Sequence, residues 1–237
     1  AIYVQEGTEK TDKQCADAKA AWDALTDAQK ELVEGENADP DYFGRDTGDA
    51  SKDDPRNQDE IGENEILVVS FGTSFNDSRV ADIKGIEDAI AAANPDWSVR
   101  RAFTAQIIIN HIQARDDEHI DNMDQALDRA VANGVKNLVV QPTHLMNGLE
   151  YNDLKDELAG YSDSFEKIVL GDPLLTSDDD FQKVMNAIVD ATKEYDDGET
   201  AICFMGHGTE ADSNSVYTKM QETLKAVSYT HLTLPTT

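Results

Sequence analysis

Short apolar runs alternate with amphipathic stretches from about residue 65 onward, and this alternation defines the expected fold. Each run is closed by glycine, proline or a polar turn before a stretch of helical period begins. The predicted strands lie at 66–70, 98–104, 138–140, 165–170 and 200–205, and the helices at 77–93, 123–132, 151–159, 177–195 and 213–227. Because strand and helix alternate without a break, the sequence predicts an α/β fold with parallel sheets flanked by helices.

Two of the predicted strands are each followed by a histidine. The run 138–140 ends at a Gln-Pro pair, and His144 follows at once. Proline cannot donate to a sheet ladder, so it is expected where a central strand ends. The run 201–205 ends in a Gly-His-Gly sequence that carries His207. Ligands bind at the carboxyl edge of parallel sheets, so both histidines are predicted at a ligand-binding edge.

Two neutral imidazoles that converge can bind a borderline metal ion such as cobalt, nickel, iron or zinc, or can act as general bases. Asp172, which closes the strand at 165–170, is a candidate oxygen ligand, although an aspartate before proline is at least as readily a turn residue. Glu87 lies beside an apolar helical face, and solvation is its default interpretation. His111 and His119 are interpreted as surface histidines.

The chain before residue 65 differs in pattern from the rest. Residues 1–35 are predicted to be a helical appendage, capped at Thr11, with one apolar face at positions 20, 22, 25, 28 and 32. Residues 36–64 are acidic, lack any period, and are interpreted as a solvated linker or a surface flap. The appendage favours an exported or cell-surface protein, and a cytoplasmic location stays open.

The rest of the chain is divided into two lobes and a tail. Residues 65–195 are predicted to form an amino-terminal lobe, and residues 196–227 the start of a carboxyl-terminal lobe. Residues 228–237 carry no charge and no helical period in an otherwise acidic chain. We therefore expect these residues to be a non-native tail that follows an incomplete second lobe.

Composition excludes several classes of protein. The net charge of -28, from 48 acidic and 20 basic residues, repels a nucleic acid backbone and attracts cations. Two cysteines, Cys15 and Cys203, give no disulfide framework, and Cys203 is predicted to be a small core residue. No apolar run is long enough to span a bilayer. The phosphate-binding glycine motifs, the serine-hydrolase elbow and the HExxH and paired CxxC metal motifs are all missing from the sequence.

Six stretches together resemble the anaerobic-type sirohydrochlorin cobalt chelatases, which belong to the class II tetrapyrrole chelatases. They are ILVVSFGTSFNDSR (66–79), GIEDAI (85–90), RAFTAQIII (101–109), VVQPTHLMNGLE (139–150), GDPLL (171–175) and FMGHGTE (204–210). The pair QPTHLMNG and GHGT is the most specific part of the resemblance. It implies two similar α/β lobes with the active site in the cleft between them.

The resemblance also implies an activity and a set of site residues. The activity is insertion of cobalt(II) into sirohydrochlorin, or a related precorrin, in anaerobic cobalamin biosynthesis. His144 and His207 match the two metal-binding and catalytic histidines of the family, and Glu87 matches its helical glutamate. Asp172 is the candidate for an acidic third metal ligand, with Asp178 as the alternative. Iron or nickel in place of cobalt stays open.

The substrate's many carboxylates oppose a net charge of -28, so Arg79, Arg100 or Arg101 is expected to supply local basic contacts. Two other functions stay open. The first is an exported carrier that binds a tetrapyrrole or a metal ion without turnover, and the second is a structural α/β module attached to surface helices. A homo-oligomer is compatible with either function and with the chelatase.

Overall fold

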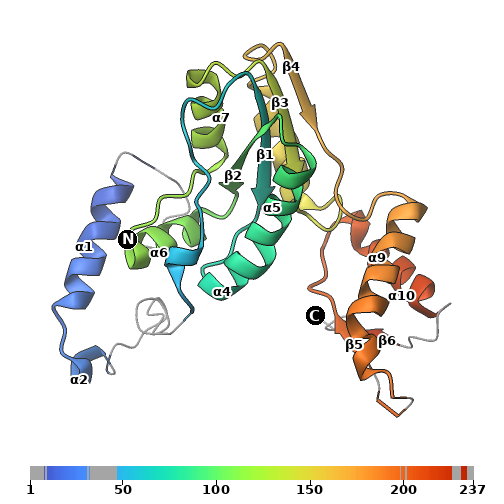
Figure 1. Cartoon of the computed structure of the whole chain (residues 1–237). Coiled ribbons are helices and arrows are strands. Elements are labelled where there is room, and N and C mark those ends of the chain that lie inside the picture. The colour runs from blue at the N-terminus through green and yellow to red at the C-terminus, as the bar shows by residue number, and fades with distance from the viewer. Residues whose placement is uncertain are drawn as a thin grey trace. The chain divides into compact units, whose positions relative to one another are not determined.

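The computed structural model describes residues 8, 10–30, 32, 47–197, 199–200, 202–225 and 231–233. The chain divides into two compact units (Figure 1). The first comprises Ala1–Pro142 and Glu157–Gly171, and the second Thr143–Asp156 and Asp172–Thr237. The lobe boundary expected near residue 195 therefore falls within the second unit.

A four-stranded parallel sheet forms the centre of the first unit. Its strands are β1 (Asn64–Ser70), β2 (Ser98–Phe103), β3 (Asn137–Pro142) and β4 (Lys167–Leu170), in the order β2-β1-β3-β4. Residues 66–70 of β1 are all buried, as expected for a parallel strand covered on both faces. The prediction of a parallel α/β sheet is confirmed, and β3 ends at Pro142 as the sequence indicates.

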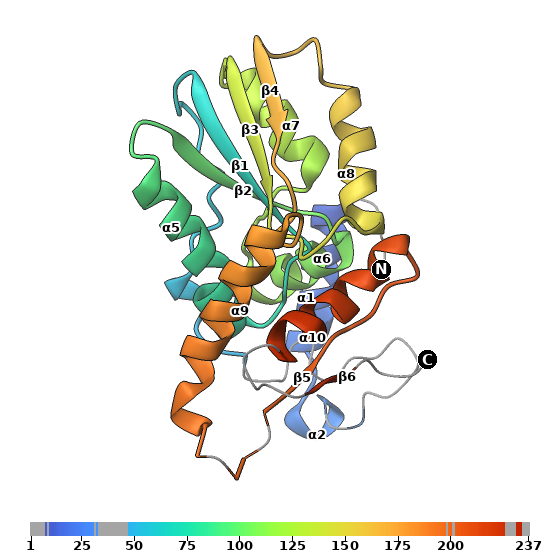
Figure 2. The same ribbon diagram turned by 90° about the vertical axis from the view of Figure 1, so that its right-hand side faces the viewer.

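Helices cover both faces of this sheet (Figures 1 and 2). They are α5 (Lys84–Ala93), α6 (Gln106–Asp116) and α7 (Met123–Ala132), and α8 (Leu149–Ala159) precedes β4 in the chain. Ile90 of α5 packs on Ile66 and Val68 of β1. On the opposite face, Arg100 of β2 donates a 2.7 Å hydrogen bond to the carbonyl of Ala126 in α7. Successive strand residues face opposite ways, which separates these two contacts.

The helical stretch after β1 differs from the prediction at its start. It consists of a short turn α4 (Asn76–Ser78), a π-helical turn η2 (Arg79–Ile83) and α5. The sequence predicts its start at residue 77, but Phe75 holds the N-cap position and makes no side-chain cap bond. Instead, the backbone carbonyl of Thr47 accepts the N–H of Asp77 at 2.8 Å. A distant segment of the chain thus replaces the usual side-chain cap.

That segment, residues 47–63, is called the strap below. It contains a 3₁₀ turn, η1 (Ala50–Lys52), and lies along the first unit. Its contacts include a 2.6 Å bond from Ser98 Oγ to the carbonyl of Ile61 and a 2.9 Å bond from Arg129 Nη1 to Asp59 Oδ1. The part of the predicted linker that the structure describes is therefore packed against the rest of the first unit. Positions 36–46 lie outside the described residues.

Within the described residues of the predicted amino-terminal appendage, the chain forms two helices. These are α1 (Thr11–Asp23) and α2 (Asp27–Lys30), and α1 packs against α6 (Figure 1). The predicted apolar face is wrong, because the side chains buried in α1 are Thr11 and Cys15. In this contact, Cys15 Sγ lies 3.6 Å from the carbonyl oxygen of Asn110. Ala20 and Leu32 are exposed.

The second unit contains α9 (Asp178–Thr192) and α10 (Ser215–Lys225), which pack side by side (Figure 2). Its short parallel strands are β5 (Cys203–Met205) and β6 (His231–Thr233), and its 3₁₀ turns are η3 (Lys193–Tyr195) and η4 (Asp212–Asn214). Ser177 and Asp180 form a capping box that begins α9. Of the predicted tail, only 231–233 lies within the described residues.

The core of the second unit is apolar, and its buried members are Leu175, Phe181, Met185, Met220 and Leu224. Phe204 of β5 packs on this cluster, whereas Cys203 is exposed. The prediction that Cys203 is a core residue is wrong, because alternation along the strand places it on the face opposite Phe204. Among the described helices, none is long and apolar enough to cross a membrane.

Gly72 gives a test of packing at the end of β1. Its φ is +101°, and a Cβ there would lie 2.6 Å from Cδ2 of Phe103. Gly72→Ala is expected to lower the free energy of unfolding by about 2–4 kcal/mol, because backbone strain and overpacking add. Gly62→Ala is the matched control: its φ is +86° but its Cβ would meet no atom within 4 Å, so it carries the strain alone. If urea unfolding shows that Gly72→Ala and Gly62→Ala lose the same free energy of unfolding, this account is contradicted.

Candidate functional site

His144 lies on the segment that follows β3 and begins the second unit. Two backbone hydrogen bonds fix this segment to the one that carries Asp172. The N–H of Leu174 donates to the carbonyl of His144 at 3.0 Å, and the N–H of Leu175 donates to the carbonyl of Leu145 at 2.9 Å. The position of His144 is therefore set by a ladder-like pairing rather than by a free loop.

The imidazole of His144 has two buried nitrogens, and neither has a hydrogen-bond partner among the described residues. Burial lowers the pKa of this imidazole, and the negative charge of Glu150 partly opposes that shift. The ring is therefore neutral at pH 7 and has one lone pair available. A buried polar group without a partner is unusual in a native structure and requires an explanation. A metal ion or a pyrrole N–H supplied by a ligand would satisfy it.

Glu150 is the carboxylate that acts electrostatically on His144. It lies in the first turn of α8, where the helix dipole favours a negative charge, and its side chain is exposed. The sequence interpretation passed over it, although it stands in the same stretch, VVQPTHLMNGLE, that carries His144. A carboxylate beside a neutral imidazole stabilises the imidazolium that forms when the ring accepts a proton.

His207 is exposed and follows β5 on a loop that α10 holds in place. The N–H of Gly208 donates a 3.2 Å hydrogen bond to the hydroxyl of Tyr217. A Cβ at Gly206 would lie 2.3 Å from Cε1 of the same tyrosine ring, so only glycine fits there. Gly208 has a φ of +83°, which also favours glycine. The glycines on either side of His207 thus allow Tyr217 to fix the loop.

Asp172 and Asp178, the candidates for a third metal ligand, both lie in the second unit. Asp172 is exposed and contributes to the raised pKa of Tyr151, behind the larger effect of burial. Asp178 is the first residue of α9 and forms an ion pair with Lys219, which lowers the pKa of the aspartate. In the part of the chain that the structure describes, no three or more His, Cys, Asp or Glu side chains gather to hold a metal ion. His144, His207 and Asp172 are therefore not brought together as such a group.

Glu87 lies in α5, in the first unit, and is fully buried. Arg101 donates two hydrogen bonds to its carboxylate, at 2.7 and 2.8 Å, and Arg56 Nε lies 3.2 Å from it. The interpretation of Glu87 as a solvated carboxylate is wrong, because its helix faces the strand that carries Arg101. Burial raises the pKa of Glu87, and the two arginines oppose this rise. The carboxylate of Glu87 is therefore already paired with arginines of the protein itself.

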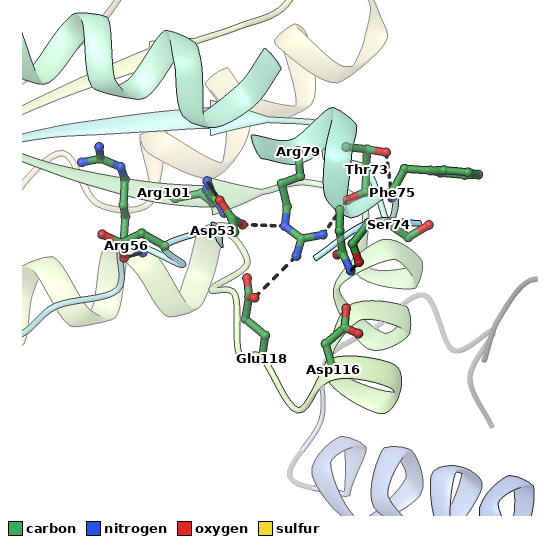
Figure 3. A network of polar contacts seen from close by, with 12 residues as sticks. Asp53, Arg56, Thr73, Ser74, Phe75, Arg79, Arg101, Asp116 and Glu118 are labelled. Atoms are coloured by element: carbon green, nitrogen blue, oxygen red, sulfur yellow. Dashed lines mark hydrogen bonds and ion pairs between the residues drawn. The ribbon is translucent and has the colours of Figure 1, made fainter. Parts of the chain in front are cut away.

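The arginines expected to meet the substrate's carboxylates are fully buried as well, so that expectation is wrong. Arg100 pairs with Glu65, at 2.8 Å. Arg101 pairs with Glu87 and with Asp53, and Arg79 also pairs with Asp53, at 2.6 Å (Figure 3). Buried guanidinium groups require carboxylate partners, and here the protein itself supplies them.

A small apolar cavity of about 150 Å³ lies within the second unit, next to both histidine segments. Leu145 and Gly206, the chain neighbours of His144 and His207, contribute to its lining, together with Phe204, Tyr217 and Met220. Ligand pockets for whole small molecules are typically about 300–1,000 Å³. This cavity therefore suits one apolar edge of a larger flat ligand.

His144 and His207 thus lie on two segments of the second unit that hydrogen bonds fix, and imidazole nitrogen is a common ligand of transition metals. Residues 64–237 match the family model described as cobalt chelatase (CbiK). The chain belongs to this family, which confirms the resemblance seen in the sequence. The strap lies before the matched residues.

Two curated relatives are both cobaltochelatases. The sirohydrochlorin cobaltochelatase of Salmonella typhimurium is 34% identical over 161 residues, which cover 68% of this chain and 61% of the relative. The sirohydrochlorin cobaltochelatase CbiKC of Nitratidesulfovibrio vulgaris is 26% identical over 164 residues, which cover 68% of this chain and 57% of the relative. The chain thus spans about three fifths of the length of these relatives.

The pKa of His144 is open to direct measurement by NMR titration of the histidine rings. We expect it below the ordinary value of about 6.5, because burial disfavours the imidazolium. In Glu150→Gln the pKa should fall further, since a negative charge that favours the imidazolium is removed. Glu222→Gln, which changes an exposed carboxylate in α10, is the control and should leave the pKa unchanged. A wild-type pKa above 6.5 would contradict the burial of this ring.

Proposed function

We propose that this chain is a chelatase that inserts cobalt(II) into sirohydrochlorin, or a closely related precorrin, in anaerobic cobalamin biosynthesis. The observation that carries the proposal is the His144 imidazole, which is buried, neutral and without a partner at either nitrogen among the described residues. The names of the two relatives give the same metal and the same macrocycle. Membership of the cobalt chelatase family adds to this support.

Metal insertion requires both a metal-delivering ligand and a proton acceptor. The macrocycle loses two pyrrole N–H protons as the ion takes their place, and the protons must pass to a base. A neutral imidazole has one lone pair, so one ring cannot bind the ion and accept a proton at the same time. The two histidines therefore divide these roles.

The environments of the two rings suggest which role each takes. His144 is buried beside Glu150, whose charge stabilises an imidazolium, so it suits the proton acceptor. His207 is exposed on a rigid loop, so it suits capture of the hydrated ion. In this proposal Glu150, which acts on His144, takes the part of the glutamate that the resemblance assigned to Glu87. The contribution of Glu87 is to hold Arg101 in the first unit.

Cobalt is the metal substrate in this proposal. Imidazole nitrogen accepts cobalt, nickel and iron alike, so the two histidines do not discriminate strongly among them. Asp172 and Asp178 are the acidic candidates for a third ligand that the resemblance offers. Asp172 stays the first choice, because the charge of Asp178 is already paired with Lys219.

A carrier that binds a tetrapyrrole or a metal ion without turnover is the second candidate. One observation favours it: within the described ranges, no set of three metal-binding side chains is assembled. A carrier needs only a ligand to the bound ion, whereas a chelatase also needs the proton acceptor. The two functions therefore differ in their dependence on Glu150 and His144.

Anaerobic incubation with sirohydrochlorin and cobalt(II), followed by absorption, tests the proposal. We expect insertion above the spontaneous rate, with a loss of about 10²–10⁴-fold in His144→Ala, the range typical for removal of a general base. His207→Ala should raise the cobalt concentration needed for half-maximal rate. His119→Ala changes an exposed histidine of the first unit and should keep full activity.

The pattern of outcomes separates the two candidates. A spectral shift on mixing that never proceeds to insertion, and that is equal in wild type and His144→Ala, would favour the carrier. Insertion at the spontaneous rate with no spectral shift would contradict both.

A further inference from the structure

The loop that follows β1, residues 71–75, presents two exposed aromatic side chains. Phe71 is 51% exposed and Phe75 is 41% exposed. The loop leaves the sheet at its carboxyl edge, where parallel α/β proteins bind ligands. In the register of β1 with β3, Val69 pairs with Pro142, the last residue before the segment that carries His144. Exposed aromatic rings at such an edge can stack on a flat conjugated macrocycle.

Two buried arginines fix the backbone of this loop. Arg79 Nη1 donates to the carbonyl of Thr73 at 3.4 Å, and Arg115 Nη2 donates to the carbonyl of Ser74 at 2.8 Å. In Figure 3 the guanidinium of Arg79 lies between the loop and the carboxylates of Asp53 and Glu118, and the ring of Phe75 points away from this network. The arginines therefore hold the backbone of the loop, while the ring of Phe75 points away from the guanidinium of Arg79.

The strap supplies the carboxylate that holds Arg79. Asp53 is fully buried, and its Oδ2 accepts hydrogen bonds from Arg79 Nε and from Arg101 Nη1, both at 2.6 Å. Burial acts to raise the pKa of Asp53, but the two arginines outweigh it and lower the pKa to about 2. Asp53 therefore stays charged at any pH near neutrality and pairs continuously with both guanidinium groups.

The strap also fixes the first turn of the helix that follows the loop. Thr47 accepts the N–H of Asp77, and the carbonyl of Gly48 accepts Asn76 Nδ2–H at 3.2 Å. The carboxyl end of the loop is thus held by residues that precede the matched family region, 64–237. Without Asp53, the charged partner that Arg79 would retain among the described residues is Glu118, at 3.5 Å. A buried guanidinium with so weak a partner would reorient and release Thr73.

We propose that Asp53 is a positioning residue, which acts through Arg79 to hold the loop at 71–75 so that Phe71 and Phe75 form the aromatic surface that receives the macrocycle. The proposal rests on the proposed chelatase function for its ligand. It assigns to the strap a part in substrate recognition beyond its packing on the sheet domain.

Asp53→Asn in the full chain tests this, because it keeps the shape of the side chain and removes its charge. We expect KM for sirohydrochlorin to rise about tenfold, while kcat and KM for cobalt(II) stay unchanged. Asp59→Asn is the matched control. It removes a strap carboxylate that pairs with another arginine, Arg129, and should leave KM unchanged.

Two further variants keep the test decisive if Asp53→Asn folds poorly. Gly48→Ala would place a Cβ 2.1 Å from Asp77 Oδ1 and 2.9 Å from its backbone nitrogen at a φ of +101°, so it displaces the strap while Asp53 and Arg79 keep their side chains. It should raise KM for sirohydrochlorin in the same way. Phe75→Ala should raise this KM too, and adding Asp53→Asn should produce little further increase, because both changes remove the same contact.

Amide hydrogen exchange of residues 71–75 separates this proposal from the chelatase proposal. Exchange should be faster in Asp53→Asn than in wild type whether or not the protein inserts metal. Faster exchange with unchanged KM, or an equal rise of KM in Asp59→Asn, would overturn the positioning role. If wild type neither binds nor converts sirohydrochlorin, the chelatase proposal fails and the positioning role fails with it. Unchanged exchange would show that the strap does not brace the loop at all.

Discussion

Burial of positive charge in a strongly acidic chain is the constraint on which the first unit depends. Arg100 and Arg101 are adjacent on β2, so their side chains face opposite sides of the sheet. Each must meet a carboxylate on its own side. Glu65 of β1 serves Arg100, while Glu87 of α5 and Asp53 of the strap serve Arg101. Replacing one partner would leave a buried charge uncompensated, which typically costs about 3–5 kcal/mol.

This constraint links the strap to the functional edge of the sheet. Asp53 joins Arg101, inside the sheet domain, to Arg79, which holds the loop after β1. The neighbouring strand β3 ends at a proline and continues into the segment of His144. Structure that looks peripheral in the sequence therefore supports a loop at the carboxyl edge of the sheet. The second unit contributes both histidines, each on a segment fixed by hydrogen bonds.

Much of the fold could be predicted from the sequence, because strand ends and caps have local signals. Pro142 ends β3, and the capping box of Ser177 begins α9. The predictions that were wrong concern residues whose interaction partners lie far away in the chain. The cap of α4 is the carbonyl of Thr47, which has no side-chain signature, and Glu87 is buried because an arginine of another strand pairs with it. Alternation within a three-residue strand exposes Cys203.

In the candidate site, too, some residues have a local signal in the sequence and others are recognised only in the folded structure. His144 and His207 follow from strand ends that can be recognised in the sequence alone. Glu150 emerges only from the structure, because its proximity to His144 depends on how the segment turns into α8. The most direct test is anaerobic titration with cobalt(II), read by visible absorption of imidazole-bound cobalt. The account predicts a saturating spectrum in wild type that is lost in the His144→Ala/His207→Ala double variant. Identical spectra in the two proteins would contradict it.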